Sequence, residues 1–351
     1  MREIIVPKRQ PGLALYTTGA WGMSPDPKGS PSPPYRGKGW CIGLRTYEFK
    51  GKPYQRLAET NEFSALRGFN PQVGSIRKVN GRSVSWTTAP ELVIFAKSQA
   101  TAQQGANLLF AAQLLRTMSL TFVDHFIALP EGSCEPEFEN YRHVLHVPGL
   151  MDAAALAARL SARRQWQYAA MKFWASYRVC GPSFWDFHPS SATHRGVTKD
   201  PFAHVACAQA ITNAYGVIEE LGLEMRASKE EPAKLDGGAW NPIVRNRLER
   251  RLQKARINLE MKFNWAVRGP RTRIEARRAL PRGAREPWTF GLLRDRKVEI
   301  VDAIAHASWL RSKVSAHRTS SLTMSLTETD VHNAQMLARR LLLESAGFLP
   351  S

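Results

Sequence analysis

The sequence is poor in cysteine, in acidic residues and in long apolar runs. Its four cysteines lie far apart at Cys41, Cys134, Cys180 and Cys207, without the closely spaced pairs that bind zinc. We expect buried, reduced thiols and neither a metal site nor a disulfide framework. No apolar run is long enough to span a membrane, and the first residues lack the apolar stretch of a secretory signal. These shortages indicate a soluble, cytoplasmic protein that has no membrane partner.

The shortage of acidic residues leaves a large positive charge. The 351 residues include 49 lysines and arginines against 30 aspartates and glutamates, a formal net charge of +19. Between residues 245 and 285 there are 14 basic and 3 acidic residues, so this segment holds more than half of the surplus. A basic run is often only a solvated face, but a surplus of this size favours binding to the phosphates of nucleic acid.

The N-terminal part of the chain has the pattern of a small β-rich unit. Residues 1–90 contain loops rich in proline and glycine, with strand-like runs at 40–49 and 75–88. The second run contains Asn80-Gly81, a turn typical of β-hairpins because both residues tolerate positive φ.

Residues 91–200 form a predicted helical middle region. Apolar residues recur at three- and four-residue spacing from 90 to 118, and a second helical stretch runs from 151 to about 177. A chain of this length and with 43% apolar residues can bury two or three cores. We therefore predict an α+β fold that is mainly α.

The third predicted domain, 201–351, reads as an up-and-down bundle of helices. Its second helix has a clear start signal, because Asn241 can cap the helix and Pro242 suits its first position. The four helices are expected at about 202–226, 242–255, 293–316 and from Thr327 or Thr329 onward.

Arg311 and His317 stand at the end of the third expected helix of this bundle. Arg311 falls on the face of Ile304 and Ser308, which should pack inward or against a partner. A guanidinium there must meet an anion or line a cleft, because burying it unpaired is costly. His317 lies about a third of a turn away on an ideal helix. The two side chains converge only if the helix ends or bends between them, or if a second subunit supplies the complementary pair.

A terminal bundle whose late helix carries an arginine and, shortly after it, a histidine resembles the HEPN superfamily (higher eukaryote and prokaryote nucleotide-binding). The stretch RSKVSAH, from Arg311 to His317, has the spacing of that family's motif. The stretch ITNAYGVIEELGLEMRAS also resembles an early bundle helix of prokaryotic members, with Glu219 and Glu220 as its polar residues. The resemblance covers residues 201–351.

The resemblance implies a ribonuclease that needs no metal and no cofactor. In that family the arginine and the histidine of the motif form the active site across a dimer. The resemblance therefore implies that Arg311 and His317 form the active site in a homodimer of this bundle. Histidine can take a proton from the ribose 2′-OH or give one to the leaving 5′-oxygen, and arginine can hold the phosphate. The product would be a 2′,3′-cyclic phosphate. Many members are toxins or antiphage effectors, which implies an antitoxin or a defence protein as a partner.

The resemblance also suggests roles for nearby residues. Glu219 or Glu220 would orient the pair, and Ser312 stands where many active members have asparagine. We expect the RNA backbone to be held by a set of basic residues, namely Arg245, Arg247, Arg250, Arg251, Lys254, Arg268, Arg271, Arg273 and Arg318.

Two other functions fit parts of the sequence. A non-catalytic nucleic-acid-binding or scaffold subunit of a defence or toxin–antitoxin complex would have the same charge. A metal-dependent nuclease is suggested by Asp26 after a proline and by the sequence Glu48-Phe49-Lys50, which together match the PD…ExK pattern for holding Mg²⁺. Asp26, however, lies in a proline-rich stretch where that site needs a strand end.

Overall fold

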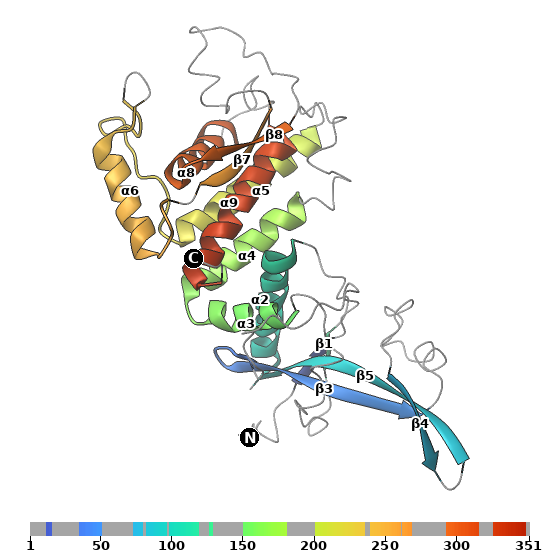
Figure 1. The fold of residues 1–351 in the computed structure, drawn as a ribbon. Helices are drawn as coiled ribbons and strands as arrows, with labels where there is room; N and C mark the ends of the chain where they lie inside the picture. Colours follow the sequence, from blue (N-terminus) through green and yellow to red (C-terminus); the bar gives the residue numbers. More distant parts are fainter. Residues whose placement is uncertain are drawn as a thin grey trace. The chain divides into compact units, whose positions relative to one another are not determined.

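A computed structural model describes the chain in twelve segments. These are residues 12–15, 35–50, 73–79, 82–96, 98–118, 126–128, 150–180, 201–235, 239–260, 262–268, 293–315 and 326–348. The chain divides into two compact units, Met1–Arg164 and Gln165–Ser351 (Figure 1).

The strands described in the first unit form an antiparallel sheet built around β5. Its strands are β1 (Gly12–Leu15), β2 (Tyr35–Arg36), β3 (Trp40–Lys50), β4 (Val73–Val79), β5 (Arg82–Ala96) and β6 (Phe126–Ala128). β5 pairs with β1, β3 and β4, while β2 pairs with β3 and β6 pairs with β1. The strand predicted at 40–49 is confirmed as β3. Val79 pairs with Arg82, which confirms the hairpin predicted from Asn80-Gly81.

The first helix of this unit begins later than its sequence pattern predicts. We expected helix from residue 90, but residues up to Ala96 belong to β5, and α2 spans Gln99–Thr117. Ser98 marks the start, because its hydroxyl oxygen accepts a hydrogen bond from the backbone N–H of Thr101 at 3.2 Å. The apolar stretch before Ser98 is strand because it pairs with β3, and this long-range pairing overrides the local helical spacing.

The helix predicted at 151–177 is two helices. α3 (Leu150–Ser161) packs against α2, and α4 (Arg164–Val179) belongs to the second unit. The backbone N–H groups of Ala162 and Arg163 bond to carbonyls three residues earlier, which is the tightened geometry that ends a helix.

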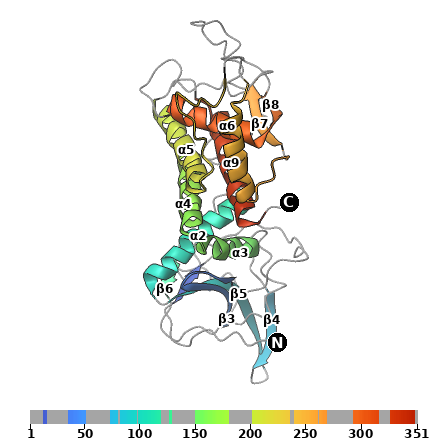
Figure 2. The same cartoon turned by 90° about the vertical axis from the view of Figure 1, so that its left-hand side faces the viewer.

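The second unit is mainly helical. Its described elements are α4, α5 (Pro201–Glu220), α6 (Pro242–Lys254), β7 (Phe263–Arg268), β8 (Leu293–Val298), α8 (Ile300–Trp309), the π-helical segment η3 (Leu310–Ser315) and α9 (Glu328–Ala346). α5 packs against α9, η3 and α8, and α6 packs against α8 (Figures 1 and 2). The coarse prediction of an α+β fold that is mainly α is confirmed.

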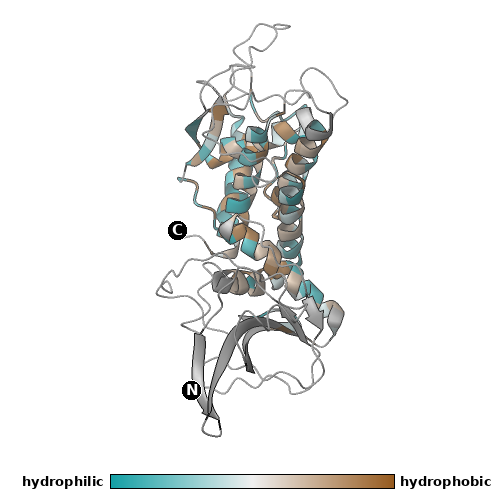
Figure 3. Cartoon of the chain, turned by 90° about the vertical axis from the view of Figure 1, so that its right-hand side faces the viewer, coloured by the Kyte–Doolittle hydropathy of each residue, from teal (hydrophilic) through white to brown (hydrophobic). Residues whose placement is uncertain are grey.

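The core of this unit lies between apolar helix faces. The helix expected at 202–226 was predicted to bury one stripe made of Cys207, Ile211, Ala214, Ile218, Leu221 and Met225. The first four are fully buried, but α5 ends at Glu220, and Leu221 and Met225 beyond it are only half-buried. On α9, the buried residues include Leu337, Ala338 and Leu341. The helices show both brown and teal positions in Figure 3, as expected of amphipathic helices with one face in a core.

Two helix starts are confirmed in detail. Asn241 caps α6, and its side-chain oxygen accepts a hydrogen bond from the Ile243 N–H at 3.0 Å. Thr327 caps α9, where the backbone N–H of Thr327 donates to the carboxylate of Asp330 at 2.9 Å.

A two-stranded sheet replaces part of an expected helix. We predicted helix from Leu293 to Ala316, but Leu293–Val298 is β8, which pairs with β7, and the helix begins only at Ile300. β7 is held to α9 by Asn333, whose side-chain amide accepts from the Ala266 N–H and donates to the Ala266 carbonyl, both at 2.8 Å. β8 is strand because it pairs with this anchored neighbour.

The two compact units differ from the three domains expected at 1–90, 91–200 and 201–351, because the chain divides inside the middle segment. In the second unit, α4 is bonded to the C-terminal helices. The hydroxyl of Ser176 donates to the Ala210 carbonyl of α5 at 2.7 Å and accepts from Gln335 of α9 at 3.1 Å.

Two further expectations concern cysteines and membrane spans. Cys180 and Cys207 are buried as predicted, Cys41 is only half-buried, and Cys134 lies outside the described residues. Among the helices that the structure describes, none has the length and apolar character needed to cross a membrane.

Candidate functional site

Arg311 lies where the helical winding changes. α8 ends at Trp309, and η3 continues from Leu310 as a π-helix, in which backbone bonds span five residues rather than four. We expected Arg311 and His317 to converge either through an end or bend of the helix between them or through a second subunit, and π-helical turns frequently occur at functional sites. His317 and Arg318 lie outside the described residues, so their positions stay predictions.

Arg311 meets a carboxylate of α5. Its Nη2 atom lies 3.4 Å from Oε1 of Glu219, and the two side chains are 41% and 39% exposed. The guanidinium carbon also lies 6.0 Å from the ring centre of Tyr215, one helical turn before Glu219 on the same face of α5. An ion pair of this exposure contributes about 0–1 kcal/mol. It is therefore weak enough for a bound phosphate to displace.

Glu220 faces another element. Its Oε1 atom lies 2.7 Å from Nζ of Lys172 on α4. Successive residues on a helix diverge by about 100°, so packing α5 against both α4 and η3 separates the roles of the two glutamates. Of the two candidates from the sequence, Glu219 contacts Arg311.

Ser312 is committed to its own helix. Its hydroxyl donates a hydrogen bond to the Ser308 carbonyl, one turn earlier, at 2.7 Å. A serine hydroxyl has one proton, so Ser312 can only accept a further hydrogen bond in this arrangement. It does not supply the donor that an asparagine amide would offer.

Tyr215 is a site residue that the sequence reasoning missed. Its side chain is 4% exposed, and its hydroxyl oxygen accepts a hydrogen bond from the Met225 N–H at 3.3 Å. Burial raises the pKa of the phenol, although hydrogen bonds with Ser308 and Met225 oppose this shift. Tyr215 thereby links α5, the turn after α5, and α8. An aromatic residue one turn before Glu219 was the available signal.

The turn after α5 brings α6 to the same place. α5 is followed by Gly222 with φ of +69°, a left-handed conformation that suits glycine. Arg251 of α6 donates from Nη1 to the Gly222 carbonyl at 2.9 Å and lies 3.7 Å from Oε1 of Glu224. Burial lowers the pKa of Arg251, and both Glu219 and Glu224 raise the pKa of Tyr215. The ion pairs Arg311–Glu219 and Arg251–Glu224 therefore both lie close to Tyr215.

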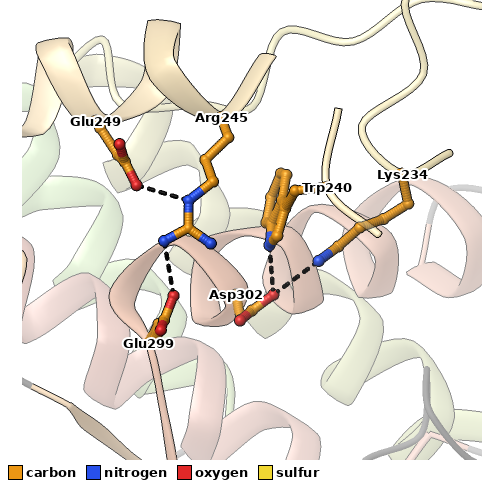
Figure 4. A network of polar contacts seen from close by, with 6 residues as sticks. All are labelled: Lys234, Trp240, Arg245, Glu249, Glu299 and Asp302. Carbon is orange, nitrogen blue, oxygen red and sulfur yellow. Dashed lines mark hydrogen bonds and ion pairs between the residues drawn. The ribbon is translucent and has the colours of Figure 1, made fainter. Parts of the chain in front are cut away.

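A second polar network fastens α6 to α8 (Figure 4). Arg245 donates from Nε to Glu249 at 2.7 Å and from Nη2 to Glu299 at 2.9 Å. Oδ1 of Asp302 accepts from Trp240 at 2.9 Å and from Lys234 at 3.0 Å. Because α8 continues into η3, this network holds the helix that carries Arg311.

The other residues of the predicted RNA-binding set fall into four groups. Arg247 pairs with Glu231 at 3.0 Å, with both side chains well exposed. Arg250 and Lys254 are exposed, and neither has a carboxylate partner among the described residues. Arg268 ends β7, and its side chain is not described. Arg271 and Arg273 lie outside the described residues, as Arg318 does.

The residues of the metal-dependent alternative are not brought together by any described contact. Glu48 and Lys50 lie on β3, and Asp26 is outside the described residues. Within the described segments, no group of three histidine, cysteine, aspartate or glutamate side chains is placed to hold a metal ion.

Comparison of the chain with models of protein families, with curated proteins and with solved structures found no match in any of the three.

Proposed function

We propose that this protein is a metal-independent endoribonuclease of the HEPN type. The observation that carries the proposal is the setting of Arg311, which combines a π-helical turn, a partly exposed guanidinium and a weak ion pair with Glu219. A cation in this setting can exchange its carboxylate partner for a phosphate. The net charge of +19 supports a polyanionic substrate.

In the proposed reaction, Arg311 binds the scissile phosphate and stabilises the charge that develops on its oxygens. His317 takes the proton of the ribose 2′-OH, and the 2′-oxygen attacks phosphorus while the bond to the 5′-oxygen breaks. In a homodimer, the second histidine gives a proton to the leaving 5′-oxygen. The products are a 2′,3′-cyclic phosphate and a 5′-hydroxyl end. Side chains carry out both proton transfers and stabilise the charge, so the proposed reaction needs no metal.

Glu219 has a role in this scheme before substrate binds. It compensates the charge of Arg311 in the free protein and holds the guanidinium over the Tyr215 ring. The resemblance further suggests a toxin or antiphage effector that acts as a homodimer through its C-terminal helices, in the cytoplasm, with an antitoxin or defence protein as regulator.

A second candidate function is a non-catalytic nucleic-acid-binding or scaffold subunit. Two observations favour it. Arg311 already has a carboxylate partner, and the Ser312 hydroxyl donates to its own helix. A protein of this kind binds RNA in a salt-sensitive way but does not cleave it.

One experiment separates the two candidates. Total RNA is incubated with the wild type and with His317→Ala, each with and without EDTA, and the end groups of any products are identified. The proposed enzyme yields 2′,3′-cyclic phosphate ends that EDTA leaves unchanged and that are lost in the variant, whose thermal melt matches the wild type. Binding without cleavage supports the second candidate, and cleavage that EDTA abolishes supports the metal-dependent nuclease.

A further inference from the structure

Four basic residues of α6 form a continuous strip, which we name the α6 basic strip. They are Arg247, Arg250, Arg251 and Lys254. At about 100° per residue, the strip begins at Arg251 and continues through Arg247 and Lys254 to Arg250, in steps of about 40°, 20° and 40° around the helix axis. The buried residues Val244, Leu248 and Leu252 border the strip at Arg251, and Arg250 lies farthest from them around the helix.

The strip keeps an excess of positive charge. Arg251 is close to Glu224, and Arg247 pairs with Glu231 in a pair whose side chains are 45% and 43% exposed. Such an exposed pair contributes about 0–1 kcal/mol, so a phosphate can replace Glu231. Arg250 and Lys254 are exposed and have no acidic partner within the described segments.

Arg245 shows the contrast on the same helix. It lies on the side that faces α8, and two carboxylates compensate its single charge. Its side chain fastens two helices together, so we leave it out of the strip.

The strip is continuous with the surroundings of Arg311. Arg251 bonds to the Gly222 carbonyl at the end of α5, and Met225 of the same turn bonds to the hydroxyl of Tyr215. The ring of Tyr215 in turn lies beside the guanidinium of Arg311. A short chain of contacts therefore connects the first residue of the strip to the proposed catalytic arginine.

We propose that the α6 basic strip binds the phosphate backbone of single-stranded RNA that extends from the Arg311 site. The inference rests on the proposed function and specifies its substrate class. From Arg247 to Lys254 the helix rises about 10 Å. A single row of cations of this length on a convex helix face can contact the phosphates of one RNA strand. The contacts are to phosphates, so the strip binds without sequence preference. A single strand also allows the 2′-oxygen to align with the leaving 5′-oxygen, which the stacked A-form duplex does not.

The test measures RNA binding without cleavage. The probe is a short fluorescent single-stranded RNA of mixed sequence with 2′-O-methyl groups, which removes the attacking hydroxyl. Its dissociation constant is measured by fluorescence anisotropy over a range of salt concentrations. The strip variant is Arg250→Gln with Lys254→Gln. The matched control is Arg294→Gln with Lys297→Gln, which removes the same charge from exposed positions on β8 in the same unit.

We expect the strip variant to bind about tenfold more weakly, with a salt dependence of log Kd smaller by about 1.4, since each phosphate contact of a single strand contributes about 0.7. The control pair should change affinity by less than about twofold, because neither residue belongs to the strip. Both variants should melt at the wild-type temperature, because all four side chains are exposed.

Three outcomes would overturn the inference. The first is that the strip variant binds RNA as tightly as the wild type, and the second is that the strip and control variants lose affinity equally. The third is that a duplex probe of the same length binds as tightly as the single strand and loses as much affinity in the strip variant. The cleavage assay with His317→Ala is read separately. If the strip variant binds normally while the wild type cleaves and His317→Ala does not, only this inference fails. If His317→Ala cleaves fully, the proposed function fails whatever the strip does.

Discussion

Arg311 of η3 and Glu219 of α5 lie 3.4 Å apart, and both side chains are partly exposed. This contact joins the predicted catalytic arginine to one of the two glutamates that the sequence offered as its partner. A carboxylate at this distance competes with any anion that approaches the guanidinium. Under the proposed function, the pair would therefore lower the affinity of Arg311 for phosphate.

Replacing Glu219 should strengthen substrate binding. In Glu219→Gln the competing charge is removed, and the KM for RNA should fall by about two- to fivefold, the equivalent of an exposed ion pair. The value of kcat should change less than KM. The matched control is Glu220→Gln, which removes an equal charge but breaks the contact with Lys172 instead. An equal fall in KM for both variants would show a general charge effect and contradict the competition.

Arg311→Gln should lower cleavage without unfolding the protein. The loss of a phosphate-stabilising donor typically reduces kcat by about 10²- to 10³-fold. The free energy of unfolding should change by less than about 1 kcal/mol, because the pair with Glu219 is exposed. Arg294→Gln, which removes a charge from an exposed position of β8, should keep full activity. Retained cleavage by Arg311→Gln, measured on the same RNA, would remove Arg311 from the mechanism.

Two arginines of α6 should separate stability from RNA binding. Arg245→Gln breaks contacts with Glu249 and Glu299 and should lower the free energy of unfolding by about 1 kcal/mol, while RNA affinity stays close to the wild-type value. Arg250→Gln should weaken RNA binding and leave the free energy of unfolding close to the wild-type value, because Arg250 is exposed and has no described acidic partner. Urea unfolding and fluorescence anisotropy measure the two effects. A loss of RNA affinity in Arg245→Gln alone would reverse the assignment.

The second unit should lose stability in alkali through Tyr177. Burial raises the pKa of Tyr177 to about 12, above the ordinary value of 10. The folded state therefore keeps its proton while the unfolded state ionises. This contribution is fully present below pH 10, and it declines as the pH rises from 10 to about 12, by about 2 kcal/mol in all.

Tyr177→Phe is the matched variant for this effect, since it keeps the ring that packs beside Phe173. Its free energy of unfolding should decline less than that of the wild type between pH 10 and 12, as measured by urea unfolding at each pH. Parallel curves for the two proteins would mean that the ionisation of Tyr177 does not affect stability.

Asn333→Ala should destabilise the second unit strongly. The amide of Asn333 satisfies both backbone groups of Ala266, and its loss leaves a buried N–H and a buried carbonyl without this partner. The expected cost is about 2–4 kcal/mol. Asn246→Ala, at an exposed position of α6, should cost less than about 0.5 kcal/mol. A melting temperature for Asn333→Ala equal to that of Asn246→Ala would show that water replaces the amide.

Some elements could be predicted from the sequence because their signals are local. Asn241 followed by Pro242 marks the start of α6, and Thr327 with Asp330 marks the start of α9, since a cap needs only a few neighbouring residues. The inward stripe of α5 was equally accessible, because the spacing of buried residues repeats the helical period.

Other elements depend on residues that are distant in the chain. Residues 90–96 have helical spacing but are strand, because they pair with β3. Leu293–Val298 could continue the next helix, yet it is strand because β7 lies beside it and Asn333 anchors β7 to α9. The spacing of apolar residues within a short segment cannot show which distant strand the segment pairs with.

The same division holds for the candidate site. By itself, the sequence determined the motif from Arg311 to His317, the excess of basic residues and the pair of glutamates on one helix. Only the tertiary structure decided that Glu219 meets Arg311 while Glu220 meets Lys172, and that Arg245 faces α8 while Arg250 faces solvent. The reason is physical, because neighbouring helix positions point in different directions and only packing settles what each direction meets.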